Sequence, residues 1–417
     1  DGTTTISAGT LTVTGRLDSG TYSANIINNS ALIYNSASAQ EFSAVVSGTG
    51  TLTKNGAGTL TLSGTNTYSG ATTISGGIIA ISDPNSLGTT AGATTVDSGA
   101  ALYISNAITV AEPITISGTG VSSSGAIRFT ANDNTYSGAI TLGATATIVS
   151  NSGQQTISGT INGSNDNTEA LTITANDDLT ISGVIGGIVD KQPSTLAITT
   201  TGTSKVLTLS SNITTDNDQT YTATGGVLLG ANITLTATGS DILFSGTAST
   251  VNSDDTTRNL TVSASEIEFD GVVGGSAALG VISITGALDL DNDITSATSL
   301  SVSTTSNLGA DVTTTGTQTY TGAATLSGGD RTLQGSTINF GNTLTGTGSD
   351  DLIITGALNL DGAATSIVNL SVSTTSDLGA DVTTTGTQTY TGAATLSGGD
   401  RTLQGSTINF GNTLTGT

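Results

Sequence analysis

An internal duplication constrains the fold of this chain more than any other feature of its sequence. Residues 300–347 recur at 370–417 with a single change, Asn307 becoming Asp377. The distance in sequence from residue 300 to its equivalent, residue 370, is the repeat offset. Near-identical tandem copies are typical of solenoids, in which each repeat packs only against its neighbours. We therefore predict one continuous β-solenoid over residues 1–417, built as a repeat array.

Short alternating patterns indicate the type of secondary structure. Apolar residues alternate with Thr or Ser at 59–63, 171–174 and 233–236, among other places. A period of two is typical of strands with one buried face, here about 4 to 6 residues long. Gly, Asn, Asp and Ser clusters separate the alternating stretches and supply turns. No segment has apolar residues at helical spacing, so we predict an all-β chain.

The length of the repeat discriminates among β architectures. A propeller blade recurs at about 40 to 50 residues, whereas an offset of about 70 divides into about three turns of roughly 23 residues, which suits a parallel β-helix with three strands per turn. We predict a right-handed parallel β-helix, with identical residues of the two copies lying above one another. Its interior should hold Leu, Ile and Val together with Phe129, Phe244, Phe269, Phe340 and Phe410.

The composition excludes several classes of chemistry and partner. The 417 residues include no His, Cys, Met or Trp, so this chain alone cannot build a catalytic triad, a Cys nucleophile or a thiolate or imidazole metal site. With 31 acidic and 8 basic side chains, it has no basic stripe for a phosphate backbone, and we expect no nucleic acid partner. No apolar run approaches the roughly 20 residues that span a bilayer, so we expect no membrane insertion by this segment.

Residues 50–88, GTLTKNGAGTLTLSGTNTYSGATTISGGIIAISDPNSLG, resemble a known family. The family is the autotransporter-associated β-strand repeat, whose pattern runs GxGTLTLSGxNTYxGxTTIxxGxL and ends near a Leu-Gly. The TQTYTGAATL units at 317–326 and 387–396 are similar, more loosely, to repeats of filamentous-haemagglutinin-like adhesins. The match to the first family is carried by Gly56, Gly58, Leu60, Leu62, Gly64, Asn66, Tyr68, Gly70, Thr72, Thr73, Gly76, Gly77, Leu87 and Gly88.

The resemblance implies a passenger of a type V secretion system. Such a protein is extracellular, on the cell surface or attached to the outer membrane of a Gram-negative bacterium. The implied function is non-enzymatic: a rigid stalk or fibre for cell-surface attachment, aggregation or biofilm matrix. The implied partners are neighbouring cells, surface glycans or copies of the chain itself, associated end to end or laterally. Because the second copy stops at Thr417 where the first continues, we expect a segment of a longer chain.

A polysaccharide-binding or polysaccharide-degrading protein is the alternative, since β-helices also carry those functions. A glycosidase needs two carboxylates about 5 to 10 Å apart, usually beside aromatic sugar platforms. The chain has no Trp, and we predict no enzyme, no catalytic residue and no cofactor. The acidic clusters weighed for catalysis are Asp177-Asp178, Asp254-Asp255, Glu266 with Glu268, Asp289 with Asp291 and Asp293, and Asp350-Asp351.

Calcium is the metal that the sequence brings into consideration. Asp289, Asp291 and Asp293 place alternate oxygens on one side of the chain, and these are the calcium candidates. The stretch lacks the Gly and the distant Glu of an EF-hand loop, so a solvated turn is the default interpretation. The repeat supports that default, since the equivalents of these residues one repeat offset later are Asn359, Asp361 and Ala363.

Five tyrosines define one position of the repeat, each preceded by Thr: Tyr68, Tyr136, Tyr221, Tyr320 and Tyr390. A row of exposed rings could stack against glycans, but half-buried strand residues at a corner are the interpretation that we favour. Asp330-Arg331 and Asp400-Arg401 are interpreted as exposed turn pairs of little energetic weight.

Overall fold

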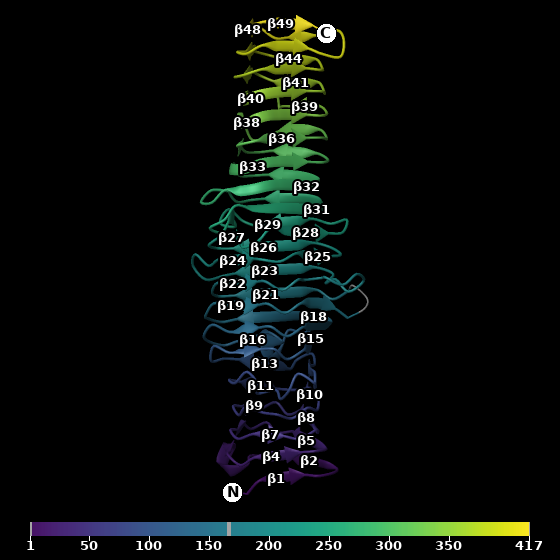
Figure 1. Ribbon diagram of the computed structural model, residues 1–417, viewed down its shortest axis with the longest axis vertical. Coiled ribbons are helices and arrows are strands. Elements are labelled where there is room, and N and C mark those ends of the chain that lie inside the picture. Colours follow the sequence, from purple (N-terminus) through teal and green to yellow (C-terminus); the bar gives the residue numbers. More distant parts are fainter. Residues whose placement is uncertain (1, 165–167, 417) are drawn as a thin grey trace. The chain divides into compact units, whose positions relative to one another are not determined.

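The computed structural model describes residues 2–164 and 168–416, which form two compact units, Asp1–Asp216 and Asn217–Thr417. In each unit, short strands pair in parallel with strands one turn earlier and one turn later, as the stacked arrows in Figure 1 show. The only helical elements of the described residues are two single 3-10 turns, Asp18–Gly20 and Val121–Ser123. The predicted all-β parallel solenoid is confirmed.

Three ladders of parallel strands form the first unit. One ladder holds β2 (Thr10–Val13), β5 (Ala31–Tyr34), β8 (Thr51–Lys54), β10 (Thr72–Ile74), β12 (Thr94–Val96), β15 (Ile114–Gly118), the start of β18 (Ile140–Ser150) and β20 (Ile161–Gly163), with β25 (Ile213–Thr215) joined through Ile185. A second ladder holds β3 (Thr21–Tyr22), β6 (Gln40–Phe42), β9 (Thr59–Leu62), β11 (Ile78–Ile81), β13 (Ala101–Ile104), β16 (Ile127–Phe129), the end of β18, β21 (Leu171–Ala175) and β23 (Leu196–Thr200). The third consists of β1 (Thr4–Ile6), β4 (Ile26–Asn28) and β7 (Val46–Ser47), and later β14 (Thr109–Val110), β17 (Thr135–Tyr136), β19 (Gln155–Ile157), β22 (Leu179–Ile181) and β24 (Leu207–Leu209).

The second unit also has three ladders, which we name faces A, B and C. Face A holds β28 (Ile233–Ala237), the starts of β31 (Arg258–Phe269) and β32 (Leu279–Leu290), the ends of β33 (Ile294–Val302), β38 (Arg331–Phe340) and β40 (Leu352–Leu360), and β36 (Thr317–Tyr320), β43 (Ser376–Leu378), β46 (Ala394–Leu396) and β49 (Leu414–Gly416). Face B holds β26 (Gln219–Ala223), β29 (Ile242–Phe244), the ends of β31 and β32, β34 (Ser306–Leu308), β37 (Ala324–Leu326), β39 (Leu344–Thr345), β41 (Ala364–Ile367), β44 (Val382–Thr384) and β47 (Leu403–Gln404). Face C holds β27 (Val227–Leu229), β30 (Val251–Ser253), the starts of β33, β38 and β40, β35 (Val312–Thr314), β42 (Leu370–Val372), β45 (Thr387–Tyr390) and β48 (Thr407–Phe410).

Alternation along each strand builds the core. In β43, for example, Ser376 and Leu378 point inward and are buried, whereas Asp377 between them is exposed. Each large apolar side chain buried in this way stabilises the fold by roughly 1.5–3 kcal/mol. Of the five phenylalanines expected inside, four are fully buried, and Phe410 on β48 is half-buried.

The turns of the duplicated region are shorter than the predicted length of roughly 23 residues. Asp289 and its partner Asn307 differ by 18 in sequence number, and Asp381 and Thr402, which are hydrogen-bonded across one turn, differ by 21. In the first of these turns, β33 runs around a corner as one strand, because Ile294 pairs with Val312 on face C and Leu300 pairs with Gln318 on face A. Corners without loops shorten the turn.

Turn length varies more widely in the first unit. Asn25 and Val45, which are hydrogen-bonded across one turn, differ by 20 in sequence number. Asp178 and Val206, which make the same kind of contact further along the unit, differ by 28. β22 and β24 are only three residues long each and pair along their whole length. The extra residues of this turn therefore lie in the chain between the two strands. The first unit therefore accommodates loops that the duplicated region lacks.

The repeat offset does not correspond to a whole number of the short turns. Tyr320 lies on face A, where Leu378 occupies the same inward ladder three turns later. The repeat equivalent of Tyr320 is Tyr390, which lies on face C next to Val372. A residue of the second copy therefore lies three turns and two faces further along the solenoid than its equivalent in the first copy. The expectation that identical residues of the copies lie above one another is wrong.

Candidate functional site

A file of outward side chains runs along face A and is the most regular surface feature of the second unit. Every member is half-buried or exposed, and each is the direct partner of the next across one turn. Hydroxyl and amide groups make up all of it except one carboxylate. This outer file of face A consists of Thr234, Thr261, Ser283, Ser301, Thr319, Asn339, Asn359, Asp377, Thr395 and Thr415.

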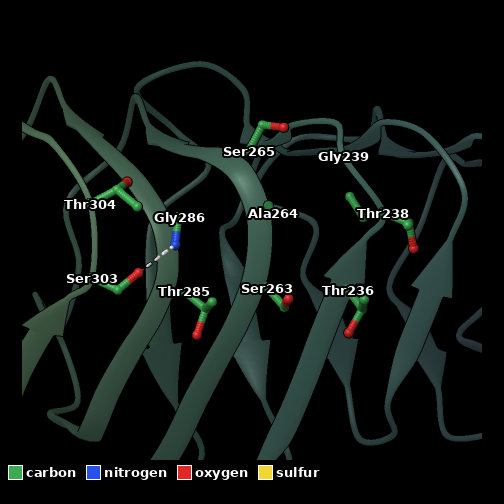
Figure 2. A pocket seen from close by; sticks show the side chains of 11 residues that line it. Thr236, Thr238, Gly239, Ser263, Ala264, Ser265, Thr285, Gly286, Ser303 and Thr304 are labelled. Carbon is green, nitrogen blue, oxygen red and sulfur yellow. Dashed lines mark hydrogen bonds between the residues drawn. The ribbon is translucent and has the colours of Figure 1, made fainter.

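A shallow groove of about 400 Å³ follows the corner where face A meets face B (Figure 2). The corner exists because β31 and β32 continue from one face to the next, with Gly286 at φ +142°, where a Cβ would strike the Ala264 carbonyl oxygen. In Figure 2, Thr236, Ser263 and Thr285 follow one another on neighbouring strands, and the Gly286 N–H donates to Ser303 Oγ at 3.1 Å. No charged or aromatic side chain lines the groove, so its polar groups are hydroxyls and backbone groups, with the methyl groups of Ala237 and Ala264 beside them.

A second groove, of about 510 Å³, lies along the outer file of face A and extends from Asn339 in the first copy to Thr395 in the second. It includes Asn359 and Asp377, which are direct partners across one turn. Their equivalents in the first copy, Asp289 and Asn307, are direct partners on face B, and Asn307 Nδ2 donates to Asp289 Oδ1 at 2.8 Å. The carboxylate is on the earlier residue of the pair, Asp289, in one case and on the later residue, Asp377, in the other. Each pair therefore keeps one negative charge.

The strongest concentration of negative charge lies at the lower edge of the first copy. Oxygen atoms of Glu268, Asp270 and Asp291 all lie within 4.8 Å of one another. Burial, followed by the neighbouring carboxylates, raises the pKa of Glu268 to about 7, and the pKa of Asp291 is raised by the same causes. Three such carboxylates can share protons or hold a hard cation.

The structure does not bring the three calcium candidates together. Asp291 joins Glu268 and Asp270 in the cluster, whereas Asp289 accepts the hydrogen bond from Asn307. Asp293 Oδ1 accepts the Asp311 backbone N–H at 3.0 Å. The solvated-turn interpretation that the sequence favours for these three residues stays a prediction. Sequence reasoning paired Glu268 with Glu266, but missed its approach to Asp291, because that contact depends on the length of the turn.

The five repeat-defining tyrosines are all fully buried, so none is available as a sugar platform. Tyr320 and Tyr390 stack on Phe340 and Phe410, with ring centroids 5.2 and 5.3 Å apart. Their hydroxyls donate to Gln318 and Gln388, each at 3.0 Å. The hydroxyl of Tyr68 bonds with Thr72, that of Tyr136 donates to the Glu112 carbonyl, and that of Tyr221 donates to Gln219. Burial is even more complete than the half-buried corner role that we favoured from the sequence.

Two basic side chains, Lys54 and Arg331, are buried against backbone carbonyls. Lys54 is fully buried, donates from Nζ to the carbonyls of Gly56 and Gly76, and lies 5.7 Å from the Tyr34 ring centroid. Burial lowers the pKa of Lys54 to about 8. Its position two residues after the buried Leu52 could have revealed the inward direction.

Arg331 corrects the interpretation of Asp330-Arg331 as an exposed turn pair. It is 9% exposed, and its guanidinium donates to the carbonyls of Leu308, Gly309, Ser327 and Asp330. Its partners are backbone carbonyls because the side chain folds back under the turn. Arg331 therefore closes a corner of the solenoid, while its equivalent Arg401 donates to the Asp400 carbonyl at 2.9 Å.

Comparisons with known proteins place this architecture in a wider context. Residues 52–81 match the family model of the passenger-associated-transport-repeat. The resemblance drawn from residues 50–88 is confirmed. Over 103 residues the chain is 50% identical to the adhesin BmaC autotransporter of Brucella suis biovar 1, a stretch that covers 25% of this chain and 3% of that relative. No solved structure matches the chain.

Both matches support a passenger of the autotransporter adhesin kind, with a surface adhesive or structural character. The chain spans only a small part of the length of this curated relative. Among residues 2–164 and 168–416, no helix has the length and hydropathy needed to cross a membrane.

Proposed function

We propose that this chain is a non-enzymatic segment of an extracellular protein that forms a rigid β-solenoid stalk or fibre on a Gram-negative cell. Its role would be attachment to neighbouring cells, aggregation or construction of a biofilm matrix. The observation that carries the proposal is the outer file of face A, a long array of hydroxyl and amide groups that includes one carboxylate. The passenger repeat at 52–81 supports the extracellular location.

The chemistry of that surface favours neutral polar partners. The formal net charge of −23 repels anionic polymers, whereas hydroxyl and amide groups can exchange hydrogen bonds with surface glycans or with another copy of the chain. Individual hydrogen bonds of this kind are weak in water, but a repeating array can bind through many of them at once. The proposal therefore places adhesion along the faces of the solenoid instead of in a single cleft.

The enzymatic alternative has less support in the second unit. Its carboxylate cluster has no aromatic platform beside it, because six of the seven aromatic side chains of that unit are fully buried and Phe410 on β48 is half-buried. Glycosidases rely on such platforms together with a paired acid and base. We accordingly propose that the chain binds polysaccharides without cleaving them.

Deleting residues 300–369 tests the proposal. This removes one repeat offset, so the second copy takes the place of the first, with Asp377 replacing Asn307 next to Asp289. We expect a folded chain with less far-ultraviolet ellipticity in total, an unchanged spectral shape, and reduced adhesion of chain-coated beads to Gram-negative cells. Global unfolding, or release of reducing sugar ends from polysaccharides by the full chain, would contradict a modular non-enzymatic stalk.

A further inference from the structure

Three buried oxygen atoms without any hydrogen-bond donor gather at one corner of the first unit. They are Glu169 Oε2, Gln192 Oε1 and Asp216 Oδ2. Backbone hydrogen bonds connect their segments across successive turns, since Ser194 N–H donates to the Glu169 carbonyl at 2.8 Å and Asp216 N–H donates to the Pro193 carbonyl at 3.1 Å. All three are acceptors, so none can satisfy another.

Glu169 is the buried carboxylate among these three residues whose surroundings the structure defines best. Its side chain is 5% exposed, and Oε1 accepts a hydrogen bond from Ser164 Oγ at 2.5 Å, while Oε2 has no partner. Neither of the salt bridges among the described residues involves Glu169. An ionised carboxylate that is buried without a cation or a full set of donors is strongly disfavoured.

Oxygen atoms border the space that the missing side chain of Gly163 leaves open. The position that a Cβ would occupy on Gly163 lies 2.8 Å from Glu169 Oε2, 3.1 Å from the Gln192 carbonyl oxygen and 3.4 Å from the Lys191 carbonyl oxygen. Because residue 163 is glycine, no side chain of its own fills the position that these three oxygens border, and the Lys191 carbonyl also accepts the Gly163 N–H at 2.6 Å. A carboxylate and two carbonyls facing a side-chain-free space form the kind of hard oxygen set that binds Ca²⁺.

We propose that Glu169 Oε2, together with the backbone carbonyls of Lys191 and Gln192, forms a binding site for a hard divalent cation of the Ca²⁺ class. Gln192 Oε1, which is buried without a hydrogen-bond partner, belongs to the same residue as one of the carbonyl ligands and is proposed as a further ligand. Asp190 and Asp216 contribute negative charge at this corner. The cation neutralises Glu169, which takes part in neither salt bridge of the described residues, and it ties the strand that follows Glu169 to the segment one turn later.

Calcium titration of the full chain tests the site. The Glu268→Gln variant serves as the reference background, because it disables the separate carboxylate cluster of the second unit. After treatment with EDTA and dialysis, we expect isothermal titration with CaCl₂ to show one site per chain, and the melting temperature to rise with calcium concentration. Adding Glu169→Gln should abolish both the heat signal and the rise, whereas Glu112→Gln, which removes another buried carboxylate of the same unit, should leave both unchanged.

Three other results would overturn the site. If Glu169→Gln melts above its background in EDTA and calcium has no effect on either, the carboxyl group is protonated and donates to a carbonyl. If calcium has no effect and Glu169→Gln does not stabilise, water fills the space. If Gly163→Ala, which places a methyl group among the three oxygens, retains full calcium binding, the cation binds elsewhere.

Discussion

The two copies of the repeat share their sequence and their internal contacts, but they face different directions. Gln318 Nε2 donates to the Val312 carbonyl at 3.0 Å on the first copy, and Gln388 Nε2 donates to the Val382 carbonyl at 3.1 Å on the second. The first arrangement connects faces A and C, while the second connects faces C and B. The contacts of a copy are therefore set by its own residues and the adjacent turn, and any of the three faces accepts them.

This comparison also identifies where the copies have diverged. The pair Asp289–Asn307 on face B becomes Asn359–Asp377 on face A, so a change at one position accompanies the opposite change at its cross-turn partner. In-register parallel neighbours lie close enough for two carboxylates to repel each other. The exchange preserves one charge per pair, which indicates that the duplication tolerates substitutions on the outer surface when the adjacent turn compensates.

The largest expected effect concerns the turn that joins the copies. The chain has no Cys, so engineered pairs report without background. Asn339→Cys with Asn359→Cys joins direct partners, and in-register strands roughly 4.7–4.9 Å apart fall within the range that a disulfide spans. We expect nearly complete oxidation, measured as loss of both free thiols in the folded chain.

The control for this disulfide follows the longer turn that the repeat length alone suggested. Asn339→Cys with Ala363→Cys would be close neighbours if each turn held roughly 23 residues. In the structure, Asn339 pairs with Asn359, and Ala363 lies beyond the end of β40, so this pair should remain reduced. If the control pair oxidises and the first pair keeps both thiols free, the turns are longer than in the structure. The two copies would then lie in phase, with identical residues above one another.

Much of the fold could be predicted from the sequence because strand alternation acts locally. The pattern Thr-Leu-Thr-Leu at β9 specifies inward Leu60 and Leu62, and both are buried. The number of faces per repeat could not be counted in the same way. Strands such as β38 round a corner with only Gly335 and Ser336 at the bend, so one continuous strand conceals two faces.

The candidate site was predictable only in part for the same reason. The acidic residues were evident from composition, but the approach of Glu268 to Asp291 requires the turn at that point to have the length that pairs Glu268 with Asp289. The burial of Glu169 depends on backbone carbonyls one turn away, and carbonyls leave no signature in a sequence.

A smaller effect is expected from breaking the exchanged pair. Asn359→Asp places a second carboxylate next to Asp377 and should lower the free energy of unfolding by about 0.5–1 kcal/mol, measured by urea denaturation at low salt. Combining it with Asp377→Asn recreates the arrangement of the first copy and should recover most of the loss. Additive effects of the two substitutions would mean that the positions are not coupled.

Asn307→Asp is the matched change on face B and should lower the free energy of unfolding by more, because Asp289 already lies next to Glu268.

The smallest expected effect is a pH dependence that distinguishes the lower edges of the two copies. Glu268 lies next to Asp289 below the first copy, whereas the amide of Asn339 occupies the corresponding place next to Asn359. Burial and neighbouring carboxylates raise the pKa of Glu268 from 4.5 to about 7. The folded state therefore holds this proton more tightly than the unfolded state, and the associated stabilisation is complete below pH 4.5 and is lost as the pH rises through 7.

Thermal melts between about pH 4.5 and 8 measure this contribution as a difference between variants. Burial also raises the pKa of Glu112 in the first unit to about 7, and the pKa of Asp291 is raised as well, so the wild-type chain loses stability over this range from more than one source. Glu268→Gln should reduce the decline in melting temperature without abolishing it, and Asn339→Gln should leave the decline unchanged. An identical decline in all three proteins would show that Glu268 titrates as an ordinary surface carboxylate, and that the acidic edge of the first copy is as well solvated as the amide edge of the second.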